Sequence, residues 1–351
     1  MRKCLAILFI LMLALNMSTA ALAEGGTYEI ALVTDVGNID DHSFNQSSWE
    51  GVVEYATANN ITHGYHQPSE DSNLAREESM KAMIEKGAKV IVLPGYLFSE
   101  SVTVIAKEYP EVQFLVLDTS PSEEGLANTY SVLYQEEQSG FFAGYAAVKD
   151  GYKKLGFLGG MAVPAVVRYG HGFVQGAEVA AAEMGVTDVE IKYWYCGGFG
   201  PTDDIKTKMS GWATEGTEVV FACGGGIFLS ALAAAEEAGT VVIGVDKDQS
   251  FDSPIIITSA MKDLKNSVVL ALETLYANGG TWGEAGGSIV TLGAKDQCVG
   301  LPTEGDAWRL STFTVEEYEA LFAKVVAGEI EISDDVDNHP AVTTVAVDYQ
   351  E

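Results

Sequence analysis

The sequence predicts an α/β protein with two doubly wound lobes, each a parallel sheet covered by helices on both faces. Short apolar runs rich in branched residues alternate with stretches of helical length, which is the pattern of βαβ units. That alternation covers residues 28–133 and begins again at residue 138. A chain of 351 residues is also longer than one hydrophobic core usually accommodates.

The first half of the chain alternates strand and helix in a regular order. Residues 28–34 form a branched apolar run, and the turn formers after it lead to Ser43, a residue type that caps helices. A helix with Phe44 and Trp49 in its first turns is expected next. Later strands are expected at residues 61–66, 89–94, 112–117 and 129–133, and later helices at 72–86 and from 97 to 109.

The second half repeats this architecture, with glycine runs after several strands. The repeat predicts the same kind of parallel sheet as in the first half. We expect strands at residues 154–158, 191–195, 218–222, 241–245, 255–259 and 288–292, and helices at 138–149, 170–184, 203–214, 229–238, 263–278 and 315–326.

Residues 1–23 have the three parts of a secretory signal. Arg2 and Lys3 precede an apolar run too short to span a bilayer comfortably, and Ala21-Leu22-Ala23 supplies a cleavage site. Cys4 lies at the wrong end to carry a lipid after cleavage. We expect an exported protein without a lipid anchor, either periplasmic or associated with a cell surface.

The charge of the chain restricts its partners. The formal net charge is −30, and cleavage of residues 1–23 makes it more negative by two. Such a field repels nucleic acid and anionic membranes, and no basic cluster offsets it for phosphorylated ligands. We therefore expect no nucleic-acid partner.

Three cysteines remain after cleavage: Cys196, Cys223 and Cys298. An odd number leaves at least one thiol free or intermolecular. Cys196 and Cys223 each end an expected strand. A disulfide between neighbouring strand ends is one interpretation, and small apolar side chains under a loop are the other.

Polar and aromatic side chains gather at the expected carboxyl ends of the strands, where α/β proteins bind ligands. Asp35 and Asp118 follow strands of the first half, and Phe199, Gly225 and Asp246 follow strands of the second. If the lobes face each other, these residues line a single cleft.

The stretch after the first strand suits a polar ligand with a flat ring. Asp35 and Asp41 offer acceptors, Phe44 an aromatic face and Asn45 an amide. The plainer interpretation is that such loops are commonly rich in Asp and Asn, and that Phe44 is core. Asp41 suits a helix cap as well as a ligand contact.

The glycine runs do not predict phosphate binding. Neither residues 197–200 nor 224–226 are followed by Lys-Ser or Lys-Thr, and neither completes a dinucleotide fingerprint. At Gly225 the backbone can approach a ligand closely, or simply turn.

Four stretches carry a resemblance to a known family: TDVGNIDDHSFNQSSWEG from Thr34, GGMAVPAVVRYGHGFVQG at residues 159–176, GVDKDQ from Gly244 and TSAMKD from Thr258. Together they resemble the basic membrane protein family of solute-binding proteins, whose better-understood members are similar to purine nucleoside receptors for ABC transporters. The resemblance covers nearly the whole mature chain.

The resemblance implies a type I periplasmic-binding-protein fold with a hinge of several crossovers. The later elements would then return to each lobe in turn. The first lobe would hold residues 24–133 and about 259–297, the second lobe 134–258 and about 298–335, and residues 336–351 would be an acidic tail.

The resemblance also implies roles for the aromatic residues. Phe44 from one lobe and Phe199 from the other would sandwich a flat base, and stacking of this kind tolerates different bases. Phe173 is similar to a third pocket aromatic, although its place on an alternating helix also suits ordinary core.

The polar residues would hold the sugar and the edge of the base. By resemblance, Asp246 accepts the ribose hydroxyls and Lys262 lies beside it, holding the carboxylate ionised. Asp35 and Asn45 are candidates for the base edge, and Asp118 is a further candidate at its strand end.

The function that the resemblance implies is delivery of a nucleoside, most of all a purine one, to an ABC permease and its ATPase. We expect a monomer that needs neither metal nor cofactor. The nearest alternative is a sugar-binding protein of the same design, and a sensor module feeding a receptor is another.

An enzyme is the more distant alternative. Residues 34–41 resemble the Asp-rich calcium loop of nucleoside hydrolases, in which carboxylates hold a cation that activates water. The likeness is incomplete, because Val33 stands where an acidic residue is expected and the spacing is one residue longer. His63 and His66 have no partner at zinc-like spacing.

Overall fold

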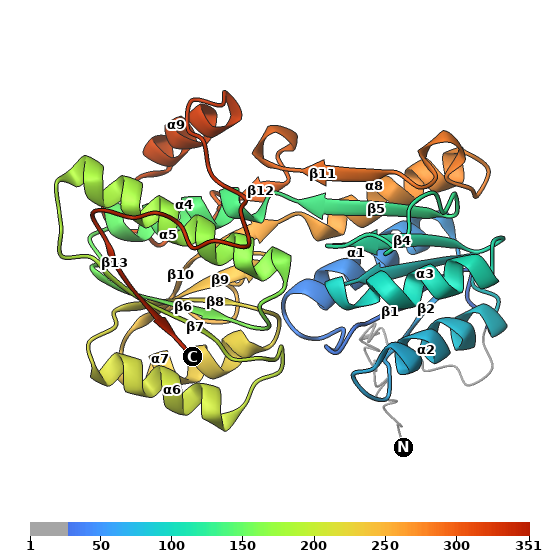
Figure 1. The fold of residues 1–351 in the computed structure, drawn as a ribbon, viewed down its shortest axis with the longest axis horizontal. Helices are drawn as coiled ribbons and strands as arrows, with labels where there is room; N and C mark the ends of the chain where they lie inside the picture. The colour runs from blue at the N-terminus through green and yellow to red at the C-terminus, as the bar shows by residue number, and fades with distance from the viewer. Residues whose placement is uncertain (1–26) are drawn as a thin grey trace, which may run out of the picture.

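The computed structural model describes residues 27–351 and has two lobes side by side, each built on one sheet (Figure 1). One sheet has the strand order β11-β5-β4-β3-β1-β2, and the other β12-β10-β9-β8-β6-β7-β13. Every strand pair is parallel except β10 with β12. The predicted fold class is confirmed, and the predicted signal segment lies outside the described residues.

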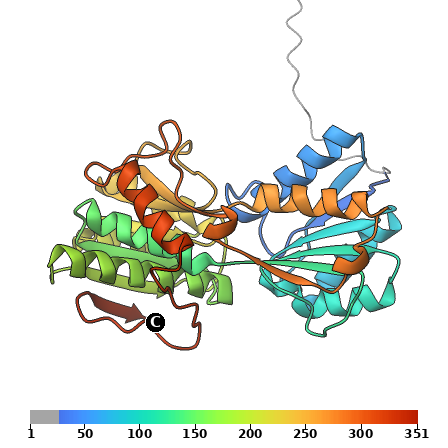
Figure 2. The ribbon, with the colours of Figure 1, turned by 90° about the horizontal axis from the view of Figure 1, so that it is seen from above.

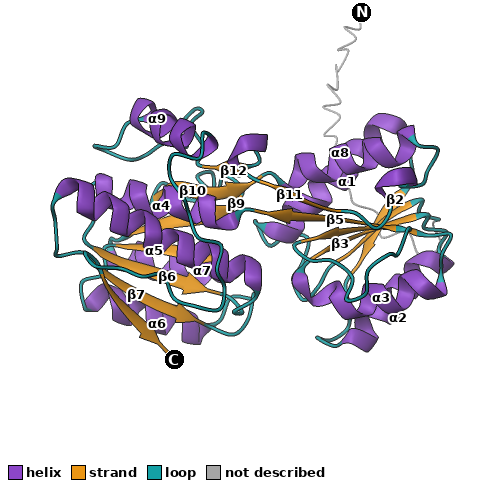
Figure 3. Ribbon diagram, turned by 45° about the horizontal axis from the view of Figure 1, so that its top comes forward, coloured by secondary structure: helices purple, strands orange, loops and turns teal. Residues whose placement is uncertain are grey.

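The first lobe is a sheet between two pairs of helices (Figure 3). Its strands are fully apolar where they are central, as in β1, because both of their faces are covered. Helices α1 and α8 pack together on one face, and α2 and α3 on the other. The elements are β1 (Ile30–Val33), α1 (Phe44–Asn59), β2 (His63–His66), α2 (Asn73–Glu85), β3 (Val90–Pro94), the 3₁₀ turn η1 (Tyr96–Phe98), α3 (Ser99–Glu108), β4 (Gln113–Leu117), β5 (Thr129–Tyr134), α8 (Leu264–Ala277), η2 (Gly283–Ala285) and β11 (Ile289–Leu292).

The second lobe repeats this plan with α4 and α5 on one face and α6 and α7 on the other. Helices α4 and α5 cross closely, because glycines face the partner backbone: a Cβ at Gly140 would lie 2.0 Å from the carbonyl oxygen of Tyr169. The elements are α4 (Glu136–Lys149), β6 (Lys154–Gly159), α5 (Pro164–Met184), β7 (Glu190–Tyr195), α6 (Asp203–Thr214), β8 (Val219–Cys223), α7 (Ile227–Ala238), β9 (Val241–Asp246), β10 (Ile256–Lys262), η3 (Ala294–Asp296), β12 (Val299–Gly300), α9 (Val315–Val326) and β13 (Ala346–Gln350).

Several elements differ from the expected bounds by a few residues, and three differences matter most. Helix α5 begins at Pro164, six residues before the expected start, because proline suits a first helical turn and the glycines after it pack against α4. Strand β10 continues to Lys262 in the second sheet, so residues 259–262 belong with the second lobe. Residues 336–351 are more than an acidic tail, since β13 pairs with β7 and forms the edge of the second sheet.

The chain crosses between the lobes three times within residues 27–351. The crossings follow β5, β10 and β11, and they lie on one side of the molecule (Figure 2). Parallel connections of this kind form a hinge about which two lobes can close. Across the described part of the chain, none of the helices combines the length and the apolar character that crossing a membrane requires.

Candidate functional site: a cavity between the lobes

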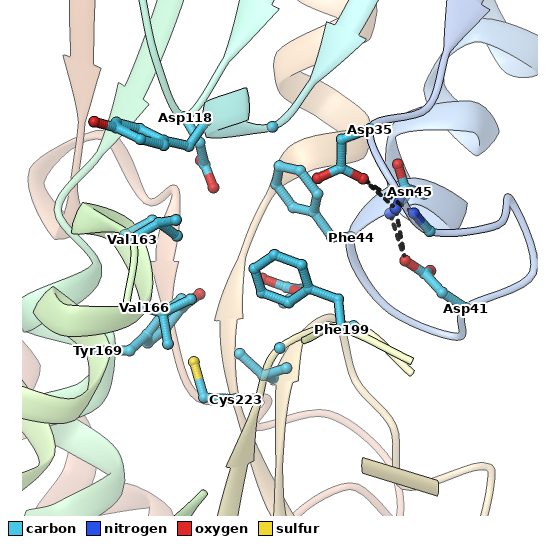
Figure 4. Close-up of a pocket in the computed structure, with 18 of the residues that line it drawn as sticks. Asp35, Asp41, Phe44, Asn45, Asp118, Val163, Val166, Tyr169, Phe199 and Cys223 are labelled. Atoms are coloured by element: carbon cyan, nitrogen blue, oxygen red, sulfur yellow. Dashed lines mark hydrogen bonds between the residues drawn. The ribbon is translucent and has the colours of Figure 1, made fainter. Parts of the chain in front are cut away.

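One cavity lies where the carboxyl ends of both sheets meet (Figure 4). The first lobe contributes the loops after β1, β3 and β4, and the second contributes the start of α5 and the ends of β7, β8, β9 and β10. The expectation that strand ends of both lobes line a single pocket therefore agrees with the structure. The lining residues are Asp35, Gly37, Asp41, Phe44, Asn45, Gly95, Tyr96, Leu97, Asp118, Val163, Ala165, Val166, Tyr169, Phe199, Cys223, Gly224, Gly225, Val245, Asp246 and Lys262.

The cavity brings together every predicted site residue except Phe173. That side chain is fully buried in the core of the second lobe, where its ring centroid lies 5.4 Å from that of Phe221 and 6.5 Å from that of Phe157. Its helix turns this face toward the sheet. The interpretation of Phe173 as a pocket aromatic is therefore wrong in this structure, and the core interpretation holds.

Asp41, not Ser43, caps the helix that carries Phe44. The carboxylate of Asp41 accepts the backbone N–H groups of Ser43, Asn45 and Gln46 at 2.9 to 3.0 Å. Charge-assisted bonds to a helix start are strong, so they fix the first turn and the ring that it carries. The expected cap by Ser43 is wrong, because its hydroxyl donates instead to Asp246 of the opposite lobe at 2.5 Å.

Asp35 and Asn45 form an acceptor-rich wall beside this helix start. Asp35 accepts the backbone N–H groups of Val36 (2.7 Å) and Gly37 (3.2 Å), and Asn45 donates its amide to Asp41 (3.1 Å). Burial raises the pKa of the Asp35 carboxyl. The buried Oδ1 of Asn45 has no hydrogen-bond partner among residues 27–351, so it can accept a hydrogen bond from a ligand.

Asp118 and Asp246 occupy equivalent positions in the two lobes. Each follows or ends a central strand and has a left-handed backbone, with φ of +64° and +66°. Such conformations are uncommon for residues other than glycine and are typical of sites where side chains must be aimed. Both carboxylates face the cavity and are buried.

Lys262 links the lobes, with a different partner from the one expected. Its ammonium donates to both oxygens of Asp118 at 2.7 and 2.6 Å and to Glu136 at 3.2 Å. Glu136 in turn accepts from Arg168 at 2.7 Å. The expected place beside Asp246 is therefore not a direct contact, although Lys262 still acts on Asp246 through charge.

Burial governs the ionisation of this network. It raises the pKa of Asp246 to about 6, and the nearby ammonium of Lys262 and the hydroxyl of Ser43 offset part of the rise. Burial also raises the pKa of Asp118, and the positive charge of Lys262 offsets part of this rise. For Lys262 the neighbouring carboxylates outweigh burial and raise its pKa, so the ammonium stays charged.

Phe44 and Phe199 project into the cavity from opposite lobes (Figure 4). Both rings are half-buried. Phe199 rests on the backbone of Gly160, where a Cβ would come within 2.5 Å of the ring. Phe44 lies beside the ammonium of Lys262, which is 4.7 Å from its ring centroid. Two aromatic surfaces, one on each lobe, thus belong to the same cavity.

Tyr169 lines the cavity and was missed by the sequence reasoning. It lies on α5 four residues before Phe173, and its buried hydroxyl has no hydrogen-bond partner among residues 27–351. Its ring is 5.7 Å from the ammonium of Lys262. The signal was present, because Tyr169 falls within the same RYGHGF stretch, one helical turn nearer the strand ends.

Of the two interpretations of Cys196 and Cys223, the structure supports the one without a disulfide. All three cysteines of residues 27–351 are free. Cys223 ends β8 and Cys196 follows β7, but β6 lies between those strands. Two strand spacings amount to about 9.5 Å, which is more than a disulfide bridges.

The Asp-rich loop does not gather its carboxylates at one point. Asp35 and Asp41 accept backbone and side-chain N–H groups, and Asp40 is exposed. Within residues 27–351, no three His, Cys, Asp or Glu side chains are grouped to hold a metal ion.

Gly225 lines the cavity with φ +55°, near Asp41 of the other lobe.

Comparison with known proteins agrees with this architecture. The chain is 29% identical over 332 residues to basic membrane protein A1 of Borrelia garinii subsp. bavariensis, covering 93% of this chain and 94% of that protein. It is 29% identical over 292 residues to the ABC transporter nucleoside-binding protein BmpA of Lactococcus lactis subsp. cremoris, covering 77% and 80%.

A crystal structure of an ABC transporter solute-binding protein from Aeropyrum pernix K1 shares the fold. It superposes with a TM-score of 0.77 at 24% identity and covers 89% of this chain and 94% of that one. A family model for PnrA-like ABC transporter substrate-binding proteins matches residues 29–335. The chain therefore belongs to the family of PnrA-like ABC transporter substrate-binding proteins.

Proposed function

We propose that this substrate-binding protein carries a nucleoside, most of all a purine nucleoside, between its two lobes. The observation that carries the proposal is that Phe44 and Phe199, from different lobes, share one cavity with the buried carboxylate of Asp246. The relative from Lactococcus lactis, named a nucleoside-binding protein, supports the same class of ligand.

Stacking of the base would couple binding to closure of the hinge. A base between two rings gains roughly 1 to 3 kcal/mol from each face. In this chain the second face is supplied only when the second lobe approaches, because Phe44 and Phe199 lie on different lobes. The ligand therefore stabilises the closed state in preference to the open one.

The carboxylate of Asp246 suits the hydroxyl groups of a ribose. It is buried and ends a strand, and two hydroxyls can donate to its two oxygens. Lys262 keeps a positive charge on the same wall, and the hydroxyl of Tyr169, which has no hydrogen-bond partner among residues 27–351, is available to the ligand. Asp35 and Asn45 remain candidates for the edge of the base.

Members of this family work with a membrane permease and an ATPase. We propose that the chain is exported by the signal at residues 1–23 and acts as a monomer. Delivery of the nucleoside to the permease would follow when the hinge opens. The proposed binding step needs no cofactor and no metal.

Isothermal titration tests the ligand class. The protein is unfolded and refolded to remove carried-over ligand, and is then titrated with adenosine, guanosine, inosine, uridine and a panel of hexoses. We expect saturable binding of purine nucleosides and no heat from any hexose. Binding of a hexose without binding of a nucleoside would favour the sugar-binding alternative. Release of free base from inosine in the presence of calcium would favour the hydrolase.

Affinity is expected to fall as the pH falls through about 6. The folded-state pKa of Asp246 is raised to about 6, so its carboxylate is protonated below that pH and cannot accept two hydroxyls. Because ligand hydroxyls favour the ionised form, binding in that range releases a proton, and the Kd rises up to about tenfold per pH unit.

Titrations between pH 5 and 8 check this dependence. The Asp246→Asn variant should bind weakly and show a flatter profile over the same range, because its amide does not ionise. An unchanged Kd in the parent protein from pH 8 to pH 5 would remove Asp246 from the site.

Tyr169→Phe is expected to weaken nucleoside binding about five- to tenfold, the value of one hydrogen bond in a buried site. The change removes only a hydroxyl that has no partner among the described residues, so stability should stay the same or rise slightly. Titration and thermal unfolding of the same sample separate the two effects. Equal affinity for the two proteins would show that the hydroxyl does not contact the ligand.

A further inference from the structure

We propose that a clasp at the mouth of the cavity holds the two lobes together and slows release of the ligand. The clasp consists of His42 and Ser43 on the first lobe and Asp246, Gln249 and Asp252 on the second. It rests on the proposed function only in that the ligand is held between the lobes.

Three hydrogen bonds make the clasp. Nδ1 of His42 lies 2.7 Å from Oδ1 of Asp252, and the side-chain amide of Gln249 donates to the carbonyl oxygen of His42 at 2.9 Å. The hydroxyl of Ser43 donates to Asp246 at 2.5 Å. All three join the loop before α1 to the end of β9 or to the segment that follows it, and so they cross from one lobe to the other.

The second-lobe half of the clasp is held rigidly. Gln249 is fully buried, and its side-chain oxygen accepts the backbone N–H of Val245 at 2.9 Å. The guanidinium of Arg309 donates to the carbonyl oxygens of Ser250 at 3.0 Å and Ser253 at 2.7 Å, on either side of Asp252. These bonds lie within the second lobe, so the loop keeps its shape when the lobes separate.

The first-lobe residues of the clasp are also held in position by contacts within their own lobe. His42 has a left-handed backbone with φ +56°, a conformation that histidine adopts more readily than most residues other than glycine. Gln46 accepts the backbone N–H of His42 at 3.1 Å from the first turn of α1, which Asp41 caps. The same loop therefore positions Phe44 in the cavity and His42 against Asp252 of the second lobe.

His42 and Asp252 slow ligand release by holding the lobes together and not by contacting the ligand. Neither lines the cavity, and their side chains are 46% and 24% exposed. A hydrogen bond between two bodies exists only while they are closed, so it shifts the balance toward the closed state. Because the ligand leaves only when the lobes part, this shift lengthens its residence time.

Dissociation rates test the clasp. In displacement experiments with bound inosine, Asp252→Ala and His42→Ala should each raise the dissociation rate about two- to fivefold, as expected for a partly exposed pair. The double variant should be no faster than the faster single variant, because both remove the same contact. Lys206→Ala is the matched control, since Lys206 pairs with Glu237 at 2.7 Å within the second lobe. It should leave the rate unchanged.

A measurement without ligand separates this inference from the proposed function. Fluorophores on α2 and α6 report the distance between the lobes, and energy transfer in the ligand-free protein should be lower in Asp252→Ala than in the parent or in Lys206→Ala. Failure of every nucleoside to bind would refute the proposed function and leave this result to decide the clasp. The clasp would be overturned by equal energy transfer in all three proteins. It would also be overturned if His42→Ala and Asp252→Ala had additive effects on the dissociation rate.

Discussion

Lys262→Met is expected to lower the free energy of unfolding by about 3 to 5 kcal/mol, the usual cost of removing one partner from a buried ionic network. The ammonium of Lys262 is buried against Asp118 and Glu136, with Asp246 nearby. Methionine preserves much of the volume but leaves the buried carboxylate of Asp118 without its cation, while Glu136 keeps its contact with Arg168. The loss should shrink as the pH falls through about 7, because the pKa of Asp118 is raised to about 7 and its carboxyl then becomes neutral.

Chemical denaturation at pH 7.5 and pH 5 measures this loss. Lys265→Met is the matched control, because Lys265 pairs with Glu54 at 2.5 Å but with side chains that are 42% and 50% exposed. An exposed pair contributes about 1 kcal/mol or less. Equal stabilities of the Lys262 and Lys265 variants would contradict the structural role given to the network.

Phe44→Ala and Phe199→Ala are each expected to raise the Kd for a purine nucleoside about five- to one-hundredfold. Each removes one stacking surface worth roughly 1 to 3 kcal/mol. The double variant should lose both, and the loss should appear for every purine, because stacking is tolerant of base identity. Titration with inosine and guanosine measures the three variants against the parent protein.

Phe251→Ala supplies the control for these truncations. Its ring is 91% exposed and lies outside the cavity, so the substitution should leave the Kd unchanged. The three Phe→Ala variants should also differ little in Tm, since Phe44 and Phe199 are only half-buried. A variant that loses Phe199 and keeps full affinity would show that the base does not lie between the two rings.

The fold and the outline of the site follow from regular features of the sequence. Parallel strands end at a common edge, so residues after strands, such as Asp35, Asp118 and Asp246, are brought together whatever the details of the loops. Because the strand–helix alternation repeats in the second half of the chain, a second sheet has an edge of the same kind, and Phe199 lies at that edge. The cavity therefore contains these residues because of where they stand along the elements.

Two features of the site depend on distances that the sequence does not give. Tyr169 and Phe173 lie four residues apart on the same face of α5 and are both buried, so periodicity could not tell which of them reaches the cavity. A four-carbon side chain such as Lys262 can reach any of several carboxylates. Its contact with Asp118 depends on how closely the lobes approach, because Asp118 lies in the first lobe and Lys262 in the second.

Ser43 illustrates the same limit at a contact between lobes. A serine before a helix suits a cap by local rules, and those rules contain nothing about the other lobe. Here Asp41 caps the helix and releases the hydroxyl of Ser43 for Asp246. Strand β13 was missed for a related reason, because a short edge strand depends on the exposed side of β7 and not on its own pattern.

A crystal structure of the mature protein with inosine tests the central claim most directly. The account predicts the base between the rings of Phe44 and Phe199 at stacking distance, with the ribose hydroxyls on the carboxylate of Asp246 and the lobes closed. Inosine bound outside this cavity, or bound within it while touching only one of the two rings, would contradict the account.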